Sequence, residues 1–233
     1  GTLTAVMIYF RIHLIGIFRA FFFMDKGIQV YLSHGGEKSV SPKEYRRLGW
    51  YLVLSIIPAA LFGFFGGDWI EQNLRTAGTV GTSLIIWGAI LAIADFYSRA
   101  HLNHQHGVNR MTWYDALFIG LAQAIPLVPG SSRSGVTMTA GLFRRLDRKS
   151  AAEFSFLMSI PIIFLGGGLK LLQLVSLETS AIAWAPIGVG FFASALSGFV
   201  AITVLMKIIE KWSFIPFAVY RIVVGLAILM FLV

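Results

Sequence analysis

Long runs of residues without charged side chains dominate this sequence, and they restrict its fold more than any other feature. A helix needs about 20 consecutive apolar residues to cross the hydrocarbon core of a bilayer. Five stretches approach or exceed that length with at most one charged residue each: Leu48–Gly67, Thr76–Ala94, Phe154–Val175, Thr179–Met206 and Trp212–Val233. The sequence therefore predicts a protein that crosses a membrane several times as helices.

The composition supports this fold class and excludes others. Of the 233 residues, 57% are hydrophobic and 13% are charged, against ~25% charged in typical soluble domains. A soluble enzyme of this length would need a larger polar surface than these residues supply, and a disordered chain would be far less hydrophobic. The absence of cysteine excludes disulfide and thiolate chemistry. We predict a single all-α integral membrane domain over residues 1–233.

The distribution of the basic residues along the chain indicates the membrane topology. The net charge is +8, but these residues lie between the apolar runs and form no continuous face typical of nucleic-acid binding, so no nucleic-acid partner is expected. If residues 113–147 enter and leave the membrane on one side, that side holds 15 of the 19 Lys and Arg residues. They lie in Arg11–Arg47 (seven), Arg99–Arg110 (two), Arg144–Lys149 (four) and Lys207–Lys211 (two). The positive-inside tendency makes this face cytoplasmic.

The N-terminal part of the chain has a mixed character. Residues 1–10 are apolar but too short to span a bilayer. Because the first residue is a glycine inside an apolar run, we expect the end of a clipped span in a chain that begins part-way through a longer protein. Residues 11–47 are predicted to form a basic loop with an interfacial helix near Ile12–Met24. Alternatively, the first span continues to Phe23 with Arg11 and Arg19 inside it.

Residues 113–147 differ from the spans and predict a re-entrant helix hairpin. Two apolar arms, Ala116–Leu127 and Val136–Phe143, are each too short to cross a bilayer, and they flank Pro-Gly-Ser-Ser-Arg-Ser-Gly at 129–135. Irregular backbone at membrane depth is tolerated only where protein buries it or where it lines a wet cavity. The turn therefore indicates a functional site. Three further spans are expected over residues 150–233.

The residues of this turn suit an anion with several oxygens, such as phosphate or pyrophosphate. Gly130 breaks the incoming arm, and Gly135 allows a tight turn at the free N–H groups of the outgoing helix. The turn adds hydroxyl and guanidinium donors from Ser131, Ser132, Ser134 and Arg133. An arginine near mid-membrane costs about 2.5–3.5 kcal/mol, whereas a helix terminus near an anion returns only about 0.3–1 kcal/mol. We therefore expect a bound anion or a carboxylate partner; the alternative is that the serines only cap the helix and Arg133 snorkels.

Other candidates are weaker. Gln123 lies on the incoming arm, where it could line the cavity or pack between helices. Arg221 lies about 15 Å along a helix from Lys211, too deep for easy snorkelling, so we expect it to pair internally or to face the cavity. Asp95 and Asp115 lie at the predicted membrane boundaries and are expected to face water.

Three motifs occur in order along the chain. The first is Gly120-Leu-Ala-Gln123 followed by Pro129-Gly-Ser-Ser-Arg-Ser-Gly-Val-Thr137. The second is Ser150-Ala-Ala-Glu-Phe-Ser-Phe-Leu157 with Pro161, and the third is Ser213-Phe-Ile-Pro-Phe-Ala-Val-Tyr-Arg221. Together they resemble the undecaprenyl-pyrophosphate phosphatases, the bacitracin-resistance family. The resemblance covers nearly the whole chain, and the string at 129–137 is highly specific.

The resemblance implies a phosphatase of the bacterial inner membrane that converts undecaprenyl pyrophosphate to undecaprenyl phosphate and phosphate, recycling the lipid carrier for cell-wall synthesis. It also implies a bundle of two inverted repeats, each with a re-entrant hairpin, and a divalent cation, Mg²⁺ or Ca²⁺. Arg133 and Ser132 are the implied catalytic residues. The implied substrate-binding residues are Gly130, Ser131, Ser134, Gly135, Thr137, Gln123 and Arg221. Membrane lipids are the other expected partners.

The chain departs from the family pattern at its first signature. The family carries two glutamates four residues apart on a re-entrant helix, followed by Pro-Val-Ser-Ser-Thr-Gly-His, and neither occurs here. The family's metal ligands and its nucleophile or base are implied to lie there. We therefore expect the metal ligands in a missing N-terminal region, and we predict that residues 1–233 alone are inactive. The alternative functions are a carrier that flips a lipid phosphate through the same anion site and a purely structural remnant.

Overall fold

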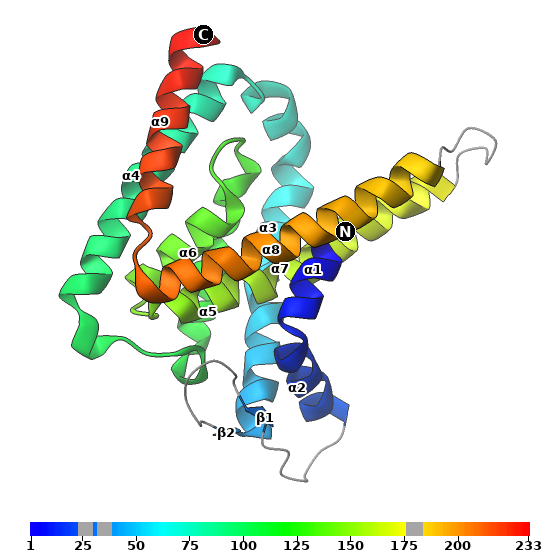
Figure 1. Ribbon diagram of the computed structural model, residues 1–233, viewed down its shortest axis with the longest axis vertical. Coiled ribbons are helices and arrows are strands. Elements are labelled where there is room, and N and C mark those ends of the chain that lie inside the picture. The colour runs from blue at the N-terminus through cyan, green and yellow to red at the C-terminus, as the bar shows by residue number, and fades with distance from the viewer. Residues whose placement is uncertain (23–29, 32–38, 176–183) are drawn as a thin grey trace. The chain divides into compact units, whose positions relative to one another are not determined.

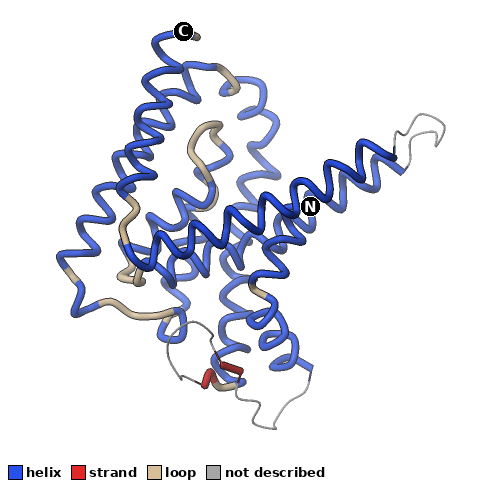
Figure 2. Tube along the Cα trace, in the orientation of Figure 1, coloured by secondary structure: helices blue, strands red, loops and turns tan. Residues whose placement is uncertain are grey.

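The computed structural model describes residues 1–22, 30–31, 39–175 and 184–233, and nearly all of these are helical (Figures 1 and 2). The α-helices are α1 (Thr2–Tyr9), α2 (Arg11–Phe22), α3 (Pro42–Leu74), α4 (Ala77–Ala100), α5 (Trp113–Ala122), α6 (Arg133–Phe143), α7 (Arg148–Val175), α8 (Trp184–Lys211) and α9 (Ile215–Phe231). Short 3-10 helices are η1 (Leu102–His104), η2 (Val108–Arg110) and η3 (Ile125–Leu127). Strands β1 (Val30–Tyr31) and β2 (Ser39–Val40) pair antiparallel. The predicted all-α fold class is confirmed.

Four helices in the described part of the chain are long and apolar enough to cross a membrane. These are α3, α4, α7 and α8, and they coincide with four of the five predicted runs. Helix α9 covers the fifth run as a shorter apolar helix of 17 residues. The first residues of the run Thr179–Met206 lie outside the described residues. The protein is therefore a multi-pass membrane protein.

Helix α3 begins at Pro42, earlier than the predicted start at Leu48. A capping arrangement explains the difference, because the Ser41 hydroxyl accepts a hydrogen bond from Glu44 N (3.3 Å) and the Glu44 carboxylate accepts one from Ser41 N (2.8 Å). Proline suits the first helical position, where its missing N–H costs nothing. The predicted basic loop over residues 11–47 therefore ends at the start of α3.

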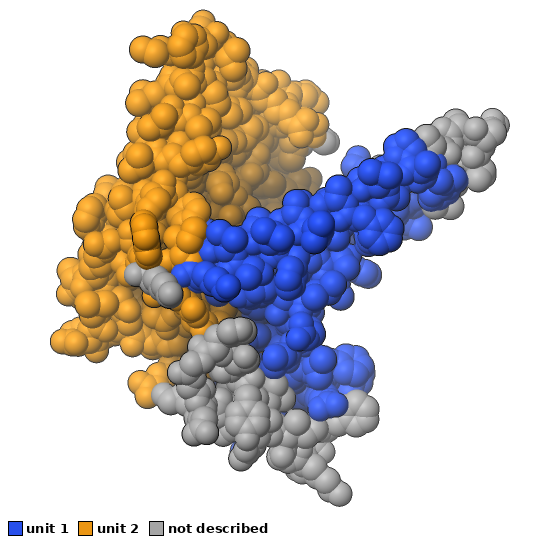
Figure 3. All heavy atoms as spheres, viewed as in Figure 1, with its two compact units in different colours: residues 1–47, 156–207 blue, residues 48–155, 208–233 orange. Residues whose placement is uncertain are grey.

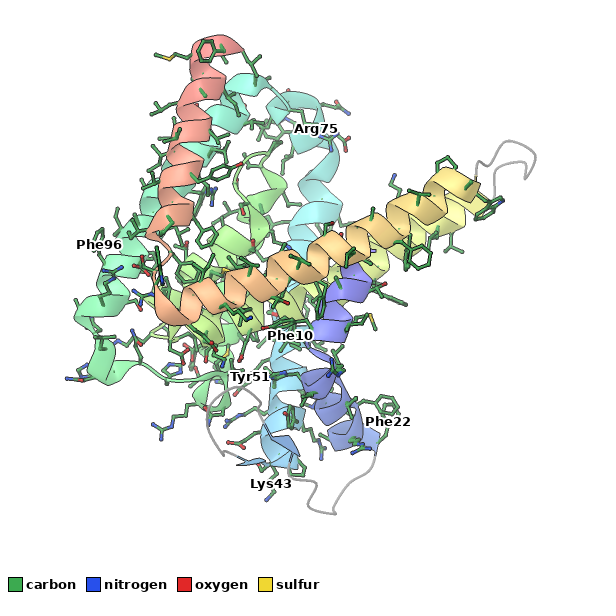
Figure 4. All side chains as sticks on the ribbon, viewed as in Figure 1. Phe10, Phe22, Lys43, Tyr51, Arg75 and Phe96 are labelled. Atoms are coloured by element: carbon green, nitrogen blue, oxygen red, sulfur yellow. The ribbon has the colours of Figure 1, made fainter. Side chains whose placement is uncertain are left out.

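Residues 1–22 form two helices and not one straight span. Their axes differ by 74° at the break between α1 and α2. Helix α2 covers the described part of the predicted interfacial helix; residues 23 and 24 lie outside the described residues. Exposed Arg11 and Arg19 share α2 with exposed Phe18 and Phe22, the last labelled in Figure 4. That mixture is typical of an interfacial helix, and its position at a membrane surface stays a prediction.

The chain divides into two compact units, coloured separately in Figure 3. Unit 1 comprises residues 1–47 and 156–207, and unit 2 comprises residues 48–155 and 208–233. In unit 1, a Cβ at Gly16 would lie 2.7 Å from the Tyr45 ring, so this glycine lets α2 approach the start of α3. Unit 2 holds the predicted hairpin and Arg221. The single membrane domain over 1–233 stays a prediction.

Helices α4 and α9 of unit 2 pack closely through glycines. A Cβ at Gly88 would lie 3.0 Å from the Ala218 carbonyl oxygen, and one at Gly225 would lie 2.7 Å from the Gly81 carbonyl oxygen. Two helix backbones come this close only where side chains are small. The two contacts set the antiparallel register of the pair, and Arg221 lies between them on α9.

The expectation that Asp95 and Asp115 face water is wrong. Their side chains are 0% and 3% exposed. Asp95 pairs with Arg148 (2.6 Å) and Arg99 (3.1 Å), and Asp115 pairs with Arg144 (2.7 Å). A carboxylate can be buried when it is paired and hydrogen-bonded, and two of these partners lie far away in the sequence. Helix α4 continues past Ala94, where the uncharged stretch ends, to Ala100.

Candidate functional site

Residues 113–147 fold as a helical hairpin within unit 2. Helix α5 begins with a capping box between Thr112 and Asp115. The 3-10 helix η3 leads into the turn, and α6 begins at Arg133. Helices α5 and α6 have 10 and 11 residues, so neither could cross a bilayer alone. The predicted short arms and turn are present, and their entry into a membrane stays a prediction.

Gly130 fixes the position of the turn. Its φ is +85°, and a Cβ there would lie 2.5 Å from the carbonyl oxygen of Val80 in the first turn of α4. Any other residue would be strained in φ and would also collide with the α4 backbone. The turn can therefore lie against α4, as Figure 1 shows beside the α4–α9 pair, only with glycine at this position.

Arg221 reaches the turn from α9. It is 7% exposed, and its Nη2 donates to the carbonyl oxygens of Gly130 (3.2 Å) and Ser131 (2.5 Å). A Cβ at Gly135 would collide with Nη1, so that nitrogen lies directly against the first turn of α6. Its Nε and Nη1 are buried and have no hydrogen-bond partner within the described residues. Arg221 thus holds the turn with one nitrogen and leaves two donors available beside α6.

Ser132 and Arg133 form the junction between the turn and α6. Ser132 caps the helix, its hydroxyl accepting a hydrogen bond from Gly135 N (3.3 Å), and its φ of 64° is unusual for a residue other than glycine. Such strained backbone is concentrated at functional sites. Arg133 is the first helical residue, and its Nη1 is buried with no partner in the part of the chain that is described.

The electrostatics of the turn favour an anion. Arg133 and Arg221 form no ion pair among the described residues, and both have buried guanidinium nitrogens without partners. A buried, unpaired cation is costly. The N-terminus of α6 adds positive potential and free N–H groups at the same place. A phosphate group held here would accept hydrogen bonds from two guanidinium groups and from the helix terminus.

The other predicted site residues lie at different depths. Ser131 is buried, and its hydroxyl donates to the Val128 carbonyl (2.8 Å). Ser134 lies half-buried in the first turn of α6. Thr137 is 1% exposed, and its hydroxyl oxygen lies 2.9 Å from the Arg133 carbonyl oxygen. Gln123 lies apart from the turn, at the end of α5, where its Nε2 is 3.4 Å from the Ser55 carbonyl of α3. The structure thus brings together Gly130, Ser131, Ser132, Arg133, Gly135 and Arg221, and the role of each stays a prediction.

Sequence reasoning missed two buried hydroxyl residues that support α6. Thr139 donates to the Gly135 carbonyl (2.7 Å), and Ser155 of α7 lies 2.7 Å from the Thr137 hydroxyl oxygen. Ser155 lies inside the second recognised motif, but nothing in that motif indicates its partner. Thr139 follows Gly135 by four residues, and this spacing could have predicted a hydrogen bond from its hydroxyl to the preceding helical turn.

A pocket of about 240 Å³ adjoins the turn on the side of α3. It is lined by Gly67, Ile70, Glu71, Arg75, Leu127 and Pro129. Arg75, labelled at the end of α3 in Figure 4, forms an exposed ion pair with Glu71 (2.8 Å). The turn thus contributes Pro129 to this pocket, while Arg221 bonds the backbone of Gly130 and Ser131.

The residues at the turn do not fit a divalent cation. Mg²⁺ and Ca²⁺ take oxygen ligands, usually from carboxylates, whereas the side chains here are guanidinium and hydroxyl groups. No group of three or more His, Asp or Glu side chains within the described residues could hold a metal ion. We therefore assign no metal ligand to this site.

Fold and site together define a multi-pass membrane protein with a helical hairpin whose cationic turn is suited to a phosphate-containing anion. The chain matches the model of the bacitracin resistance protein BacA family over residues 1–227 and belongs to that family. It is 42% identical over 225 residues to the undecaprenyl-diphosphatase of Teredinibacter turnerae, covering 97% of this chain and 79% of that protein. The undecaprenyl-diphosphatase of Saccharophagus degradans is 38% identical over 225 residues (97% and 78%), and that of Colwellia psychrerythraea is 37% identical over 232 residues (100% and 82%). The predicted resemblance is confirmed.

Proposed function

We propose that this protein is an undecaprenyl-diphosphatase of the bacterial inner membrane. Water cleaves the phosphoanhydride bond of undecaprenyl pyrophosphate, which releases inorganic phosphate and leaves undecaprenyl phosphate for another round of cell-wall synthesis. Membership of the bacitracin-resistance family and the relatives named undecaprenyl-diphosphatase support this activity. The structural observation that carries it is the pair of arginines Arg133 and Arg221, which have buried guanidinium nitrogens and no carboxylate partner among the described residues.

These residues would bind and neutralise the pyrophosphate. Phosphoryl transfer depends largely on positioning and on stabilising the charge of the phosphoryl oxygens. Arg133 would donate from its guanidinium at the start of α6, and Arg221 would donate from Nε and Nη1 while its Nη2 holds the turn. The Ser132 and Ser134 hydroxyls would complete the donor set. Burial strengthens each of these interactions because the surrounding dielectric is low.

A divalent cation is also part of the proposal, on the strength of the family resemblance alone. When bound, it would neutralise charge on the pyrophosphate oxygens. The described residues supply no ligand set for it, so no step of the reaction is assigned to it here.

Replacing Arg133 by lysine in the complete gene product tests the proposal. Lysine keeps the charge but cannot reproduce the planar fork of donors, so we expect phosphate release per molecule to fall about a hundredfold or more. Arg110→Lys is the matched control, because Arg110 is exposed and lies in the loop before α5. Equal rates for the two variants would contradict the proposed role of the turn.

Measuring phosphate release by the unaltered protein separates hydrolysis from lipid transport. Purified protein in detergent should release phosphate from undecaprenyl pyrophosphate, because hydrolysis needs no second compartment. A lipid carrier would instead move intact lipid across vesicles and release none. Movement without hydrolysis by the unaltered protein would replace the phosphatase with the carrier.

A further inference from the structure

A short chain of buried hydroxyl groups links α7 to the first residue of α6. Ser155 is 3% exposed, and its Oγ lies 2.7 Å from the Oγ1 of Thr137, which is 1% exposed. The Thr137 hydroxyl also lies 2.9 Å from the Arg133 carbonyl oxygen and 3.2 Å from that of Ser134. These hydrogen bonds therefore connect Ser155, through Thr137, to the backbone of Arg133.

The number of available protons fixes which group donates in each hydrogen bond of this hydroxyl network. Each hydroxyl has one proton to donate and two lone pairs to accept with, and a backbone carbonyl can only accept. If Thr137 gives its single proton to the Arg133 carbonyl, Ser155 must donate to Thr137. Ser155 thereby orients the threonine hydroxyl toward α6. Without the serine, the threonine loses the group that selects this orientation.

Close packing places the two hydroxyl residues opposite each other. A Cβ at Gly141 of α6 would lie 3.0 Å from the Cβ of Ala151 on α7. Moving four residues back from Gly141 reaches Thr137, and moving four residues forward from Ala151 reaches Ser155. The Gly141 contact thus sets an antiparallel register in which the next pair along is Thr137 and Ser155. The serine anchors the first turn of α6 to a long helix.

We infer that Ser155 is a positioning residue that holds the first turn of α6, and with it Arg133, in the geometry that the anion needs. The inference rests on the proposed function of the turn. Hydroxyl bonds from a threonine back to the preceding turn slightly destabilise a helix, so the contact is better explained by the geometry that it fixes than by helix stability. A displacement of about 1 Å at a reacting group can cost up to a hundredfold in rate.

Ser155→Ala in the complete gene product tests the inference by removing only the hydroxyl. We expect kcat for phosphate release to fall about tenfold and KM to rise by a smaller factor, because alignment matters most in the transition state. Ser98→Ala is the matched control. Ser98 is also a buried serine, and it bonds the Gln105 side chain (2.9 Å) in the loop after α4. The control should keep the kcat of the unaltered protein.

Thr137→Val completes a double-mutant cycle. If the two hydroxyls act as one chain, the Ser155→Ala/Thr137→Val protein should be no slower than Thr137→Val alone. Two results would overturn the inference. One is a double variant whose kcat loss equals the product of the two single-variant losses, and the other is a Ser155→Ala kcat within twofold of the control. If Ser155→Ala fails to fold, Ser155→Cys keeps the size with a weaker donor, and its kcat should lie more than about twofold below that of Ser98→Ala.

Binding of inorganic pyrophosphate separates this inference from the proposed function. Ligand binding raises the temperature of unfolding. If the unaltered protein binds pyrophosphate but releases no phosphate from the lipid, the proposed function fails. The inference then survives only if the rise in unfolding temperature is smaller in Ser155→Ala than in Ser98→Ala.

Discussion

The two ends of the hairpin within unit 2 contain similar arginines with opposite surroundings. At the end where α5 begins and α6 ends, four cations have carboxylate partners, in the pairs Asp95–Arg99, Asp95–Arg148, Asp115–Arg144 and Glu210–Lys149. At the turn, Arg133 and Arg221 have none among the described residues, although both are partly or fully buried. Paired cations hold helices together, whereas unpaired ones leave an electrostatic cost that a bound anion would remove.

The largest effect should come from replacing Arg133 by methionine, which keeps an unbranched side chain but removes the charge. We expect phosphate release to fall about a thousandfold, the size of effect seen when an arginine that stabilises a phosphoryl transition state is removed. The unfolding temperature should stay the same or rise, because an unpaired buried charge is lost. Both quantities can be measured on detergent-purified protein.

Arg148→Met is the matched change at the other end of the hairpin. It removes a cation of the same kind that pairs with Asp95, so the unfolding temperature should fall while activity per folded molecule is retained. If the two variants behaved alike in both measurements, the distinction between paired and unpaired arginines would have no functional meaning.

The next largest effect concerns Asp95, which accepts from Arg148, Arg99 and the Phe214 backbone N–H (3.3 Å). Asp95→Asn should destabilise the protein by about 3 kcal/mol, because it leaves two arginines without their buried partner. Glu71→Gln breaks an exposed pair with Arg75 and should cost only about 0.3–0.5 kcal/mol. Equal losses in unfolding experiments would show that burial of Asp95 adds nothing to the pairing.

Local patterns explain which features could be predicted from sequence. Uncharged length revealed the spans, and the Pro-Gly and Ser-Gly breakers around Arg133 revealed the turn. Arg221 was recognised as a buried cation from its distance to Lys211 alone. Partners distant in sequence could not be predicted, because no local rule connects Asp95 with Arg148 or Thr137 with Ser155. The same limit explains why Asp95 was wrongly expected to face water.

The smallest effect is a pH dependence at Asp115. Burial by itself raises the pKa of this carboxyl, but hydrogen bonds from Thr112 and Arg144 outweigh it and hold the pKa below its ordinary value. A carboxyl with a lowered folded pKa contributes stability that is present above its unfolded pKa of about 3.9 and is lost as pH falls through the folded value. Asp115→Asn should therefore lower the unfolding temperature at pH 7, by less than Asp95→Asn does, and this difference from the unaltered protein should shrink as pH falls below about 4. A difference that is constant between pH 7 and pH 3 would mean that the capping box and the Arg144 contact do not depend on the charge of Asp115.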